Sequence, residues 1–155
     1  MEDQETLRNE VLTFLKNQFI MSVAVSDENK PSASVLLYYV DDDFTFYFAT
    51  HTDSYKAKAL KKNPLISMAI WKHNEMLVQC DGSVSEVSGE NEKLDIIDKL
   101  ANSTNKGDDF WPPLLRIKGS DYVVFKIKPT WLRKLDLVQD TMTQTDSPFS
   151  ELKLS

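Results

Sequence analysis

The sequence predicts a mainly β fold, a barrel-like sheet with helical insertions. Seven short segments have the apolar or alternating pattern of strands, and most are joined by tight polar turns, as in β-barrels. Three segments have helical periodicity, but too few strands are separated by crossover helices for a doubly wound sheet. The expected strands span residues 19–25, 32–40, 44–49, 65–71, 76–88, 122–128 and 131–138.

The N-terminal part begins with an amphipathic helix over residues 3–16, where apolar side chains recur at helical spacing. A strand over 19–25 follows, and the polar turn SDENKP leads into the strand 32–40. In the next strand, 44–49, three phenylalanines alternate with other residues and mark one face. These segments predict a sheet with one apolar side.

A short helix over 54–62 interrupts the strands. It is expected to end at Asn63, because Pro64 restricts the residue before it and cannot continue a helix. The strand 76–88 is long, and Gly82 within it indicates a bulge or bend. Local breaks in strand pairing are therefore expected here.

The last third of the chain contains a helix over 90–102 and then roughly twenty residues without a regular pattern. Loops of that length are usually functional or disordered, and Trp111 argues against plain disorder. Pro129 separates the two final strands. We expect one β domain over residues 1–138 and a polar, loosely held tail over 139–155.

Composition argues against several functional classes. A length of 155 residues, 41% of them hydrophobic, favours one globular domain. The net charge of −6 argues against a nucleic-acid coating function, and no apolar run is long enough to span a bilayer. The start MEDQETLRNE resembles no secretory signal, and the lone Cys80, expected to be buried, fits the reducing cytoplasm.

The junction between the third expected strand and the short helix has the composition of an anion site. Thr50 and Ser54 carry hydroxyl donors, a first helical turn has unpaired backbone N–H groups, and Lys56 adds a positive charge. A lysine there opposes the helix macrodipole, and a bound anion would explain its placement. The residues also allow a plainer interpretation, in which Asp53 or Ser54 caps the helix and the lysines form a solvated face.

A longer pattern resembles the pyridoxamine 5′-phosphate oxidase-like, FMN-binding split-barrel superfamily, over roughly residues 8–138. It comprises PSASVLLYYVDDDFTFYFATHTDSYKAKALKKNPLISMAIW, then VQCDGSVSEV, then VVFKIKPTWLRKLDL. The most specific part is Thr50…Ser54-x-Lys56…Asn63-Pro64. True pyridoxine-phosphate oxidases end in an Arg-x-His segment, which is absent from QDTMTQTDSPFSELKLS, so the resemblance favours the general-stress-protein-like branch.

The resemblance implies a phosphate site. In the family, the positions matched by Thr50, Ser54 and Lys56 hold the phosphate of FMN. Tyr55 departs from the pattern, because the oxidases proper have a second basic residue there. Lys56, assisted by Lys58, would then be the main fixed charge, with less geometric control than an arginine would give.

The resemblance also implies a homodimer with two cofactor sites at its interface. The strand matched by Ser34, Val35 and Leu36 would lay its backbone along the flavin ring, although many relatives have an arginine about where Ser34 stands. Gln79 would reach the ring edge from the neighbouring subunit. Trp111 would either cover the flavin or fill the dimer interface.

The leading expectation for function is a flavin-dependent oxidoreductase that transfers a hydride or electrons to an unknown small substrate, with no catalytic residue assigned. The alternatives are a flavin-binding or stress-related protein without catalysis, and a cofactor-free β-barrel interaction module. The absence of a G-x-G-x-x-G motif favours FMN over a dinucleotide, and deazaflavin F420 is an open alternative. The aspartates at 41–43 are expected to point to water rather than to bind a metal.

Overall fold

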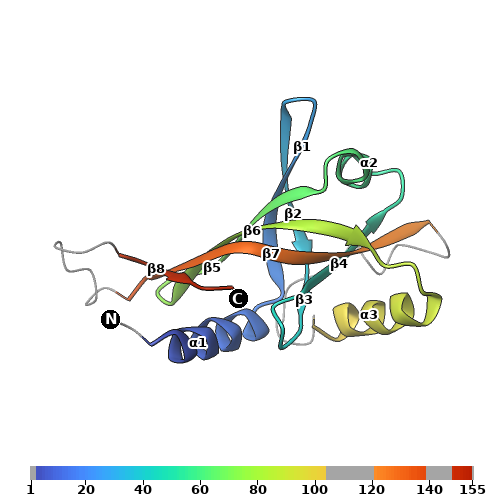
Figure 1. Ribbon diagram of the computed structural model, residues 1–155. Helices are drawn as coiled ribbons and strands as arrows, with labels where there is room; N and C mark the ends of the chain where they lie inside the picture. Colours follow the sequence, from blue (N-terminus) through green and yellow to red (C-terminus); the bar gives the residue numbers. More distant parts are fainter. Residues whose placement is uncertain (1–2, 104–120, 139–147, 155) are drawn as a thin grey trace.

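The protein is described here from a computed structural model, which covers residues 3–103, 121–138 and 148–154 (Figure 1). Within these ranges an antiparallel sheet curls into a half-barrel with helices around it. The strand order is β2-β1-β5-β6-β7-β4-β3, and β8 pairs with β7. The predicted mainly β fold with helical insertions is confirmed.

The described elements follow one another along the chain in this order. They are α1 (Gln4–Asn17), β1 (Ile20–Asp27), β2 (Lys30–Leu37), β3 (Tyr39–Val40), β4 (Phe46–His51), α2 (Tyr55–Lys62), β5 (Leu65–Lys72), β6 (Met76–Glu86), α3 (Glu90–Ser103), β7 (Tyr122–Asp136) and β8 (Phe149–Leu152).

The corner at Tyr38 brings the two ends of the sheet together. β2 and β3 are consecutive in sequence but lie at opposite ends of the strand order. Tyr38 between them is buried, its N–H donates to the carbonyl of Phe19 at 3.0 Å, and its hydroxyl donates to the carbonyl of Leu15 at 2.5 Å. The single strand expected over 32–40 is therefore wrong, because the chain must turn at Tyr38 to cross from one edge to the other.

The main core fills the inside of the half-barrel. Phe46 and Phe48 of β4 are fully buried, and the Phe48 ring lies 5.4 Å from that of Phe125 between centroids. Phe44 is also buried, but its φ of 62° takes it out of the strand, so β4 begins two residues later than expected. A second cluster joins α3 to the outer side of β4 and β7.

A bulge shapes β6 and explains a second departure from the expected elements. The register between β6 and β7 shifts between Asp81 and Gly82, so the bulge predicted at Gly82 is confirmed. Gly82 lies opposite Pro129, and the two strands expected on either side of that proline are one continuous strand, β7. Pro129 lacks an N–H to donate, and proline is tolerated in a strand beside such a bulge.

The C-terminal residues that the structure describes are part of the sheet. Phe149–Leu152 form β8 against β7, and Leu152 is buried. The side-chain amide of Gln4 in α1 accepts a hydrogen bond from the N–H of Lys153 at 2.9 Å and donates one to the carbonyl of Glu151 at 3.3 Å. The expectation of a loosely held tail is therefore wrong for residues 149–152.

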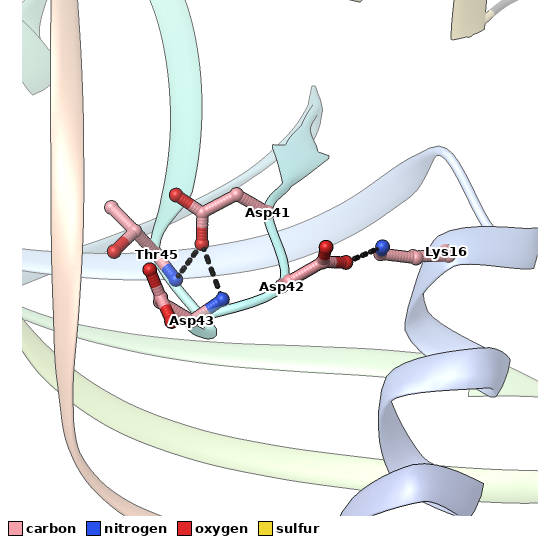
Figure 2. A network of polar contacts seen from close by, with 5 residues as sticks. All are labelled: Lys16, Asp41, Asp42, Asp43 and Thr45. Carbon is pink, nitrogen blue, oxygen red and sulfur yellow. Dashed lines mark hydrogen bonds and ion pairs between the residues drawn. The ribbon is translucent and has the colours of Figure 1, made fainter.

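The three aspartates before β4 build a turn, as Figure 2 shows. The carboxylate of Asp41 accepts hydrogen bonds from the N–H groups of Asp43 at 2.9 Å and Thr45 at 3.0 Å. Asp42 pairs with Lys16 at the end of α1. The concentration of acidic residues here is thus accounted for by chain reversal and by attachment of α1.

Candidate functional site

The candidate site is the junction where β4 ends and α2 begins. Thr50 is the penultimate residue of β4 and is nearly buried. Ser54 is the N-cap of α2, with extended backbone (φ −64°, ψ 150°), and its Oγ accepts a hydrogen bond from the N–H of Ala57 at 3.1 Å. Of the two capping residues that the sequence allowed, the structure selects Ser54.

The hydroxyl groups of Thr50 and Ser54 form a hydrogen-bonded pair in which one hydroxyl hydrogen is not used. Thr50 Oγ1 and Ser54 Oγ are 3.1 Å apart, and either can donate to the other. Whichever donates, the second hydroxyl keeps a hydrogen that is not used in this contact. The junction can therefore donate one hydroxyl hydrogen bond without breaking the helix cap.

The first turn of α2 adds backbone donors. The N–H of Ala57 is used by Ser54 Oγ, and the N–H of Lys58 donates to the carbonyl of Ser54 at 3.1 Å. Within the described chain, no acceptor is present for the N–H groups of Tyr55 and Lys56. The first turn has no acidic residue, so its partial positive charge is not offset locally.

Lys56 is the main charged group of the junction. It is half-buried, and no residue in the described ranges forms an ion pair or a hydrogen bond with its ammonium group. Burial lowers the pKa of Lys56, because the charged form has lost water and gained no counter-ion. Lys62 at the other end of the helix, by contrast, pairs with Asp27 at 3.3 Å.

These donors suit an anion with several oxygen atoms. The junction combines one hydroxyl hydrogen, two backbone N–H groups and one ammonium group, and Asp53, which precedes the N-cap, is exposed. A phosphate accepts hydrogen bonds from this set at a helix N-terminus. Lys58 is exposed, and no described contact brings it to the junction, so its expected assistance stays a prediction.

Ser34, Val35 and Leu36 lie together on β2, as expected, at one end of the strand order. Among the described strands, β2 pairs with β1 alone, so the backbone groups on its other edge have no strand partner. The start of this strand is attached to α2, because the Tyr55 hydroxyl donates to the carbonyl of Lys30 at 3.1 Å. The free edge of β2 thus belongs to the same end of the molecule as the junction.

Gln79 is not at the Thr50 junction of its own chain. β7 pairs with both strands, placing Thr50 opposite Val123 and Gln79 opposite Arg133. Those two β7 positions are ten residues apart, about 33 Å along an extended strand at 3.3 Å per residue. Gln79 therefore does not line the junction of its own chain, and its expected contact with the ring from a neighbouring subunit stays a prediction. The other predicted site residue, Trp111, lies outside the described residues.

Arg133 is a residue that the sequence reasoning missed. Its Nε donates to Gln79 Oε1 at 2.9 Å, and its guanidinium lies 3.8 Å from the centroid of the Phe149 ring and 5.2 Å from that of Trp131. The alternation of Trp131 and Arg133 along one strand was the available signal. The contact of Arg133 with Phe149 depends on β8, which the sequence did not reveal.

The outer face of the sheet carries an uncovered apolar surface. A row of outward side chains crosses four strands, because Val35 is opposite Ser22, Ser22 opposite Ala69, and Ala69 opposite Gln79. The same face exposes Val35, Leu65 and Trp71, at 60%, 64% and 61% of their areas. Beside Leu65 a groove of about 510 Å³ opens over the bulge at Gly82. We call this surface the outer face.

Cys80 lies on the opposite side of β6, buried in the main core. Burial raises the pKa of its thiol to about 12, so the group is protonated near neutral pH. This confirms the expected interpretation as a small buried apolar residue. In the described ranges, no helix is long and apolar enough to cross a membrane.

Comparison with known proteins places most of the chain in one family. Residues 7–136 match the family model described as Pyridoxamine 5′-phosphate oxidase. A curated relative, the pyridoxine/pyridoxamine 5′-phosphate oxidase of Ehrlichia ruminantium, is 33% identical over 89 residues. That match covers 56% of this chain and 44% of the oxidase, so less than half the relative's length is represented.

Solved structures support the split-barrel fold. General Stress Protein 26 from Bacillus anthracis superposes with a TM-score of 0.64 at 22% identity, covering 83% of this chain and 92% of that one. A FAD-binding protein from Mesorhizobium loti also gives a TM-score of 0.64, at 17% identity, covering 81% of this chain and 90% of that one. At these identities the likeness concerns the fold.

Proposed function

We propose that this chain, which belongs to the pyridoxamine 5′-phosphate oxidase family, binds FMN with the phosphate at the junction of β4 and α2. The observation that carries the proposal is the half-buried ammonium of Lys56, which has no counter-ion in the described chain. A phosphate with nearly two negative charges would supply that counter-ion. The hydrogen bond between Thr50 and Ser54 leaves one hydroxyl hydrogen to join it.

Two parts of the chain would hold the ligand: the β4–α2 junction would bind the phosphate, and β2 would contact the ring. The Thr50–Ser54 hydroxyl pair, the N–H groups of Tyr55 and Lys56, and the Lys56 ammonium would hold the phosphate. The backbone of Ser34–Leu36, on the free edge of β2, would orient the ring. The absence of a G-x-G-x-x-G motif favours FMN over a dinucleotide.

We propose further that the protein is an oxidoreductase acting on a small molecule. FMN supplies hydride and electron transfer when bound, and the protein supplies its position and electrostatic surroundings. In the described ranges no residue at the junction is assigned as a proton donor; the nearby His51 is exposed, and its Nδ1 accepts the N–H of Asp53 at 3.1 Å. Hydride transfer needs no such donor.

Spectroscopy tests both parts of the proposal. Purified protein incubated with FMN and desalted should retain a flavin absorption band near 450 nm. Anaerobic NADH or NADPH should then bleach the band if the protein is an oxidoreductase. If neither reductant bleaches the band, the result would favour a flavin-binding protein without oxidoreductase activity. No binding of FMN near 100 µM, roughly −5.5 kcal/mol, would refute the flavin proposal. Retention of deazaflavin F420 but not of FMN would mean that the deazaflavin is the cofactor of this site.

We propose that two copies associate through the outer face. Its exposed Val35, Leu65 and Trp71 form an apolar surface of the kind that marks interaction sites. Gln79 lies in the row of outward side chains that crosses this face, so association would bring it, with Arg133, towards the cofactor of the other chain. Sedimentation velocity at micromolar concentration should show a dimer, and a monomer would contradict the proposal.

A further inference from the structure

Tyr55 connects the first turn of α2 to the start of β2. Its hydroxyl donates to the carbonyl oxygen of Lys30 at 3.1 Å. The ammonium of the same lysine lies 5.5 Å from the centroid of the Tyr55 ring, within the range of a cation–π contact. One residue of the helix therefore holds both the backbone and the side chain of Lys30.

The other end of α2 fixes the same hairpin. Lys62 pairs with Asp27 at 3.3 Å, and the side-chain amide of Asn63 donates to the carbonyl of Ser26 at 3.3 Å. The hairpin turn itself is tight, with Glu28 and Asn29 at φ values of 48° and 66°. Figure 1 shows α2 beside the upper part of the β1–β2 hairpin. The place of Lys30 beside the first helical turn is thus fixed by contacts at both ends of the helix.

We infer that Lys30 supplies the second positive charge of the phosphate site, positioned by Tyr55. The inference rests on the proposed binding of FMN. The Tyr55 ring, at the start of α2, holds a cation from another strand beside the first helical turn. In the described chain Lys30 forms no ion pair, so its charge is available to an anion bound at the junction.

The contribution of Lys30 should be smaller than that of Lys56. Lys30 is exposed, so its charge acts on the phosphate through water rather than through a sheltered contact. In a medium close to water, two unit charges interact by about 1 kcal/mol at 4 Å and by less at longer range, so the change in affinity should be roughly two- to fivefold. The effect should weaken with added salt, because the Debye length falls to about 10 Å at 0.1 M and less above it.

The experiment compares FMN and riboflavin binding by fluorescence quenching at low and high salt. Lys30→Met should weaken FMN binding two- to fivefold at low salt and hardly at all at high salt. Riboflavin, which has no phosphate, should bind equally well to the variant and the wild type. Lys61→Met is the matched control, since Lys61 is exposed at the far end of the same helix.

Tyr55→Leu tests the positioning role. It removes the ring and the hydroxyl while keeping both lysines, and should reproduce the loss caused by Lys30→Met. The double variant should then be no weaker than Lys30→Met alone, because both changes remove the same contribution. Tyr55→Phe, which keeps the ring and is the milder change for folding, should lose less affinity.

Three outcomes separate this inference from the function on which it rests. If Lys56→Met weakens FMN binding and Lys30→Met behaves like Lys61→Met, the inference is overturned and the phosphate site remains. Equal losses for FMN and riboflavin in Lys30→Met would also overturn it, because the effect would not involve the phosphate. If the wild type binds neither flavin, the proposed function and this inference fail together.

Discussion

Replacing Lys56 by methionine separates the binding role of this residue from any role in folding. Methionine keeps most of the aliphatic stem and removes only the charge. Burial lowers the pKa of the lysine below that of an unfolded chain, so the unfolded state binds protons more readily. The charged lysine therefore disfavours the ligand-free fold at neutral pH, and this penalty disappears as the pH rises towards and above the unfolded value of about 10.5.

The expected magnitudes follow from the surroundings of Lys56. A hydrogen bond to a charged group contributes about 1.5–3 kcal/mol, and a half-exposed ammonium belongs near the lower end. Lys56→Met should therefore weaken FMN binding about tenfold, with riboflavin binding unchanged. The melting temperature of the ligand-free variant should equal or exceed that of the wild type, because the variant buries no unpaired charge.

The assay is fluorescence titration with each flavin, together with thermal unfolding of the ligand-free protein, and Lys61→Met serves as the exposed control. Equal weakening for FMN and riboflavin would refute the phosphate role of Lys56. A marked fall in the melting temperature without ligand would refute the argument in another way, because it would mean that Lys56 has a stabilising partner in the fold.

Three further changes test the fold and the assembly. Gly82→Ala should lower the free energy of unfolding in urea by about 1–3 kcal/mol, because the added Cβ would lie 2.7 Å from the carbonyl oxygen of Lys128. Gly89→Ala is the control and should be nearly neutral, because the added Cβ would lie 3.8 Å from its nearest neighbour, the Cβ of Glu92. Leu152→Ala should lower the free energy of unfolding by about 2–5 kcal/mol if β8 belongs to the fold, and replacing the partly buried Leu154 by alanine should lower it less. Equal and negligible losses from both changes would mean that these residues form a loosely held tail. Trp71→Glu should turn a dimer into a monomer in sedimentation while leaving the far-ultraviolet circular dichroism unchanged, and a persisting dimer would place the interface elsewhere.

The β4–α2 junction could be anticipated from the sequence because its determinants are local. A serine before a helix, a lysine in its first turn and an Asn-Pro after it all lie within residues 54–64. The structure adds what local rules could not provide, namely that Lys56 is half-buried and without a counter-ion in the described ranges. Burial depends on how α2 packs on the sheet.

The departures from the expected elements arise from long-range contacts. Pro129 ended a strand in the sequence analysis, but the bulge opposite it at Gly82 accommodates the missing N–H, so β7 continues. β8 lies in a polar segment whose sequence pattern does not predict a strand. It is held by pairing with β7 and by hydrogen bonds to the distant Gln4. The contact between Tyr55 and Lys30 joins positions 25 residues apart and had no local signal.

A crystal structure of the protein grown with FMN measures the central claim directly, as the distance from Lys56 Nζ to the nearest phosphate oxygen. We expect a charge-assisted contact of about 2.7–2.9 Å, with Thr50 or Ser54 donating a hydroxyl hydrogen to the same phosphate. A flavin bound elsewhere, or a phosphate more than about 5 Å from Nζ, would contradict the assignment of this junction.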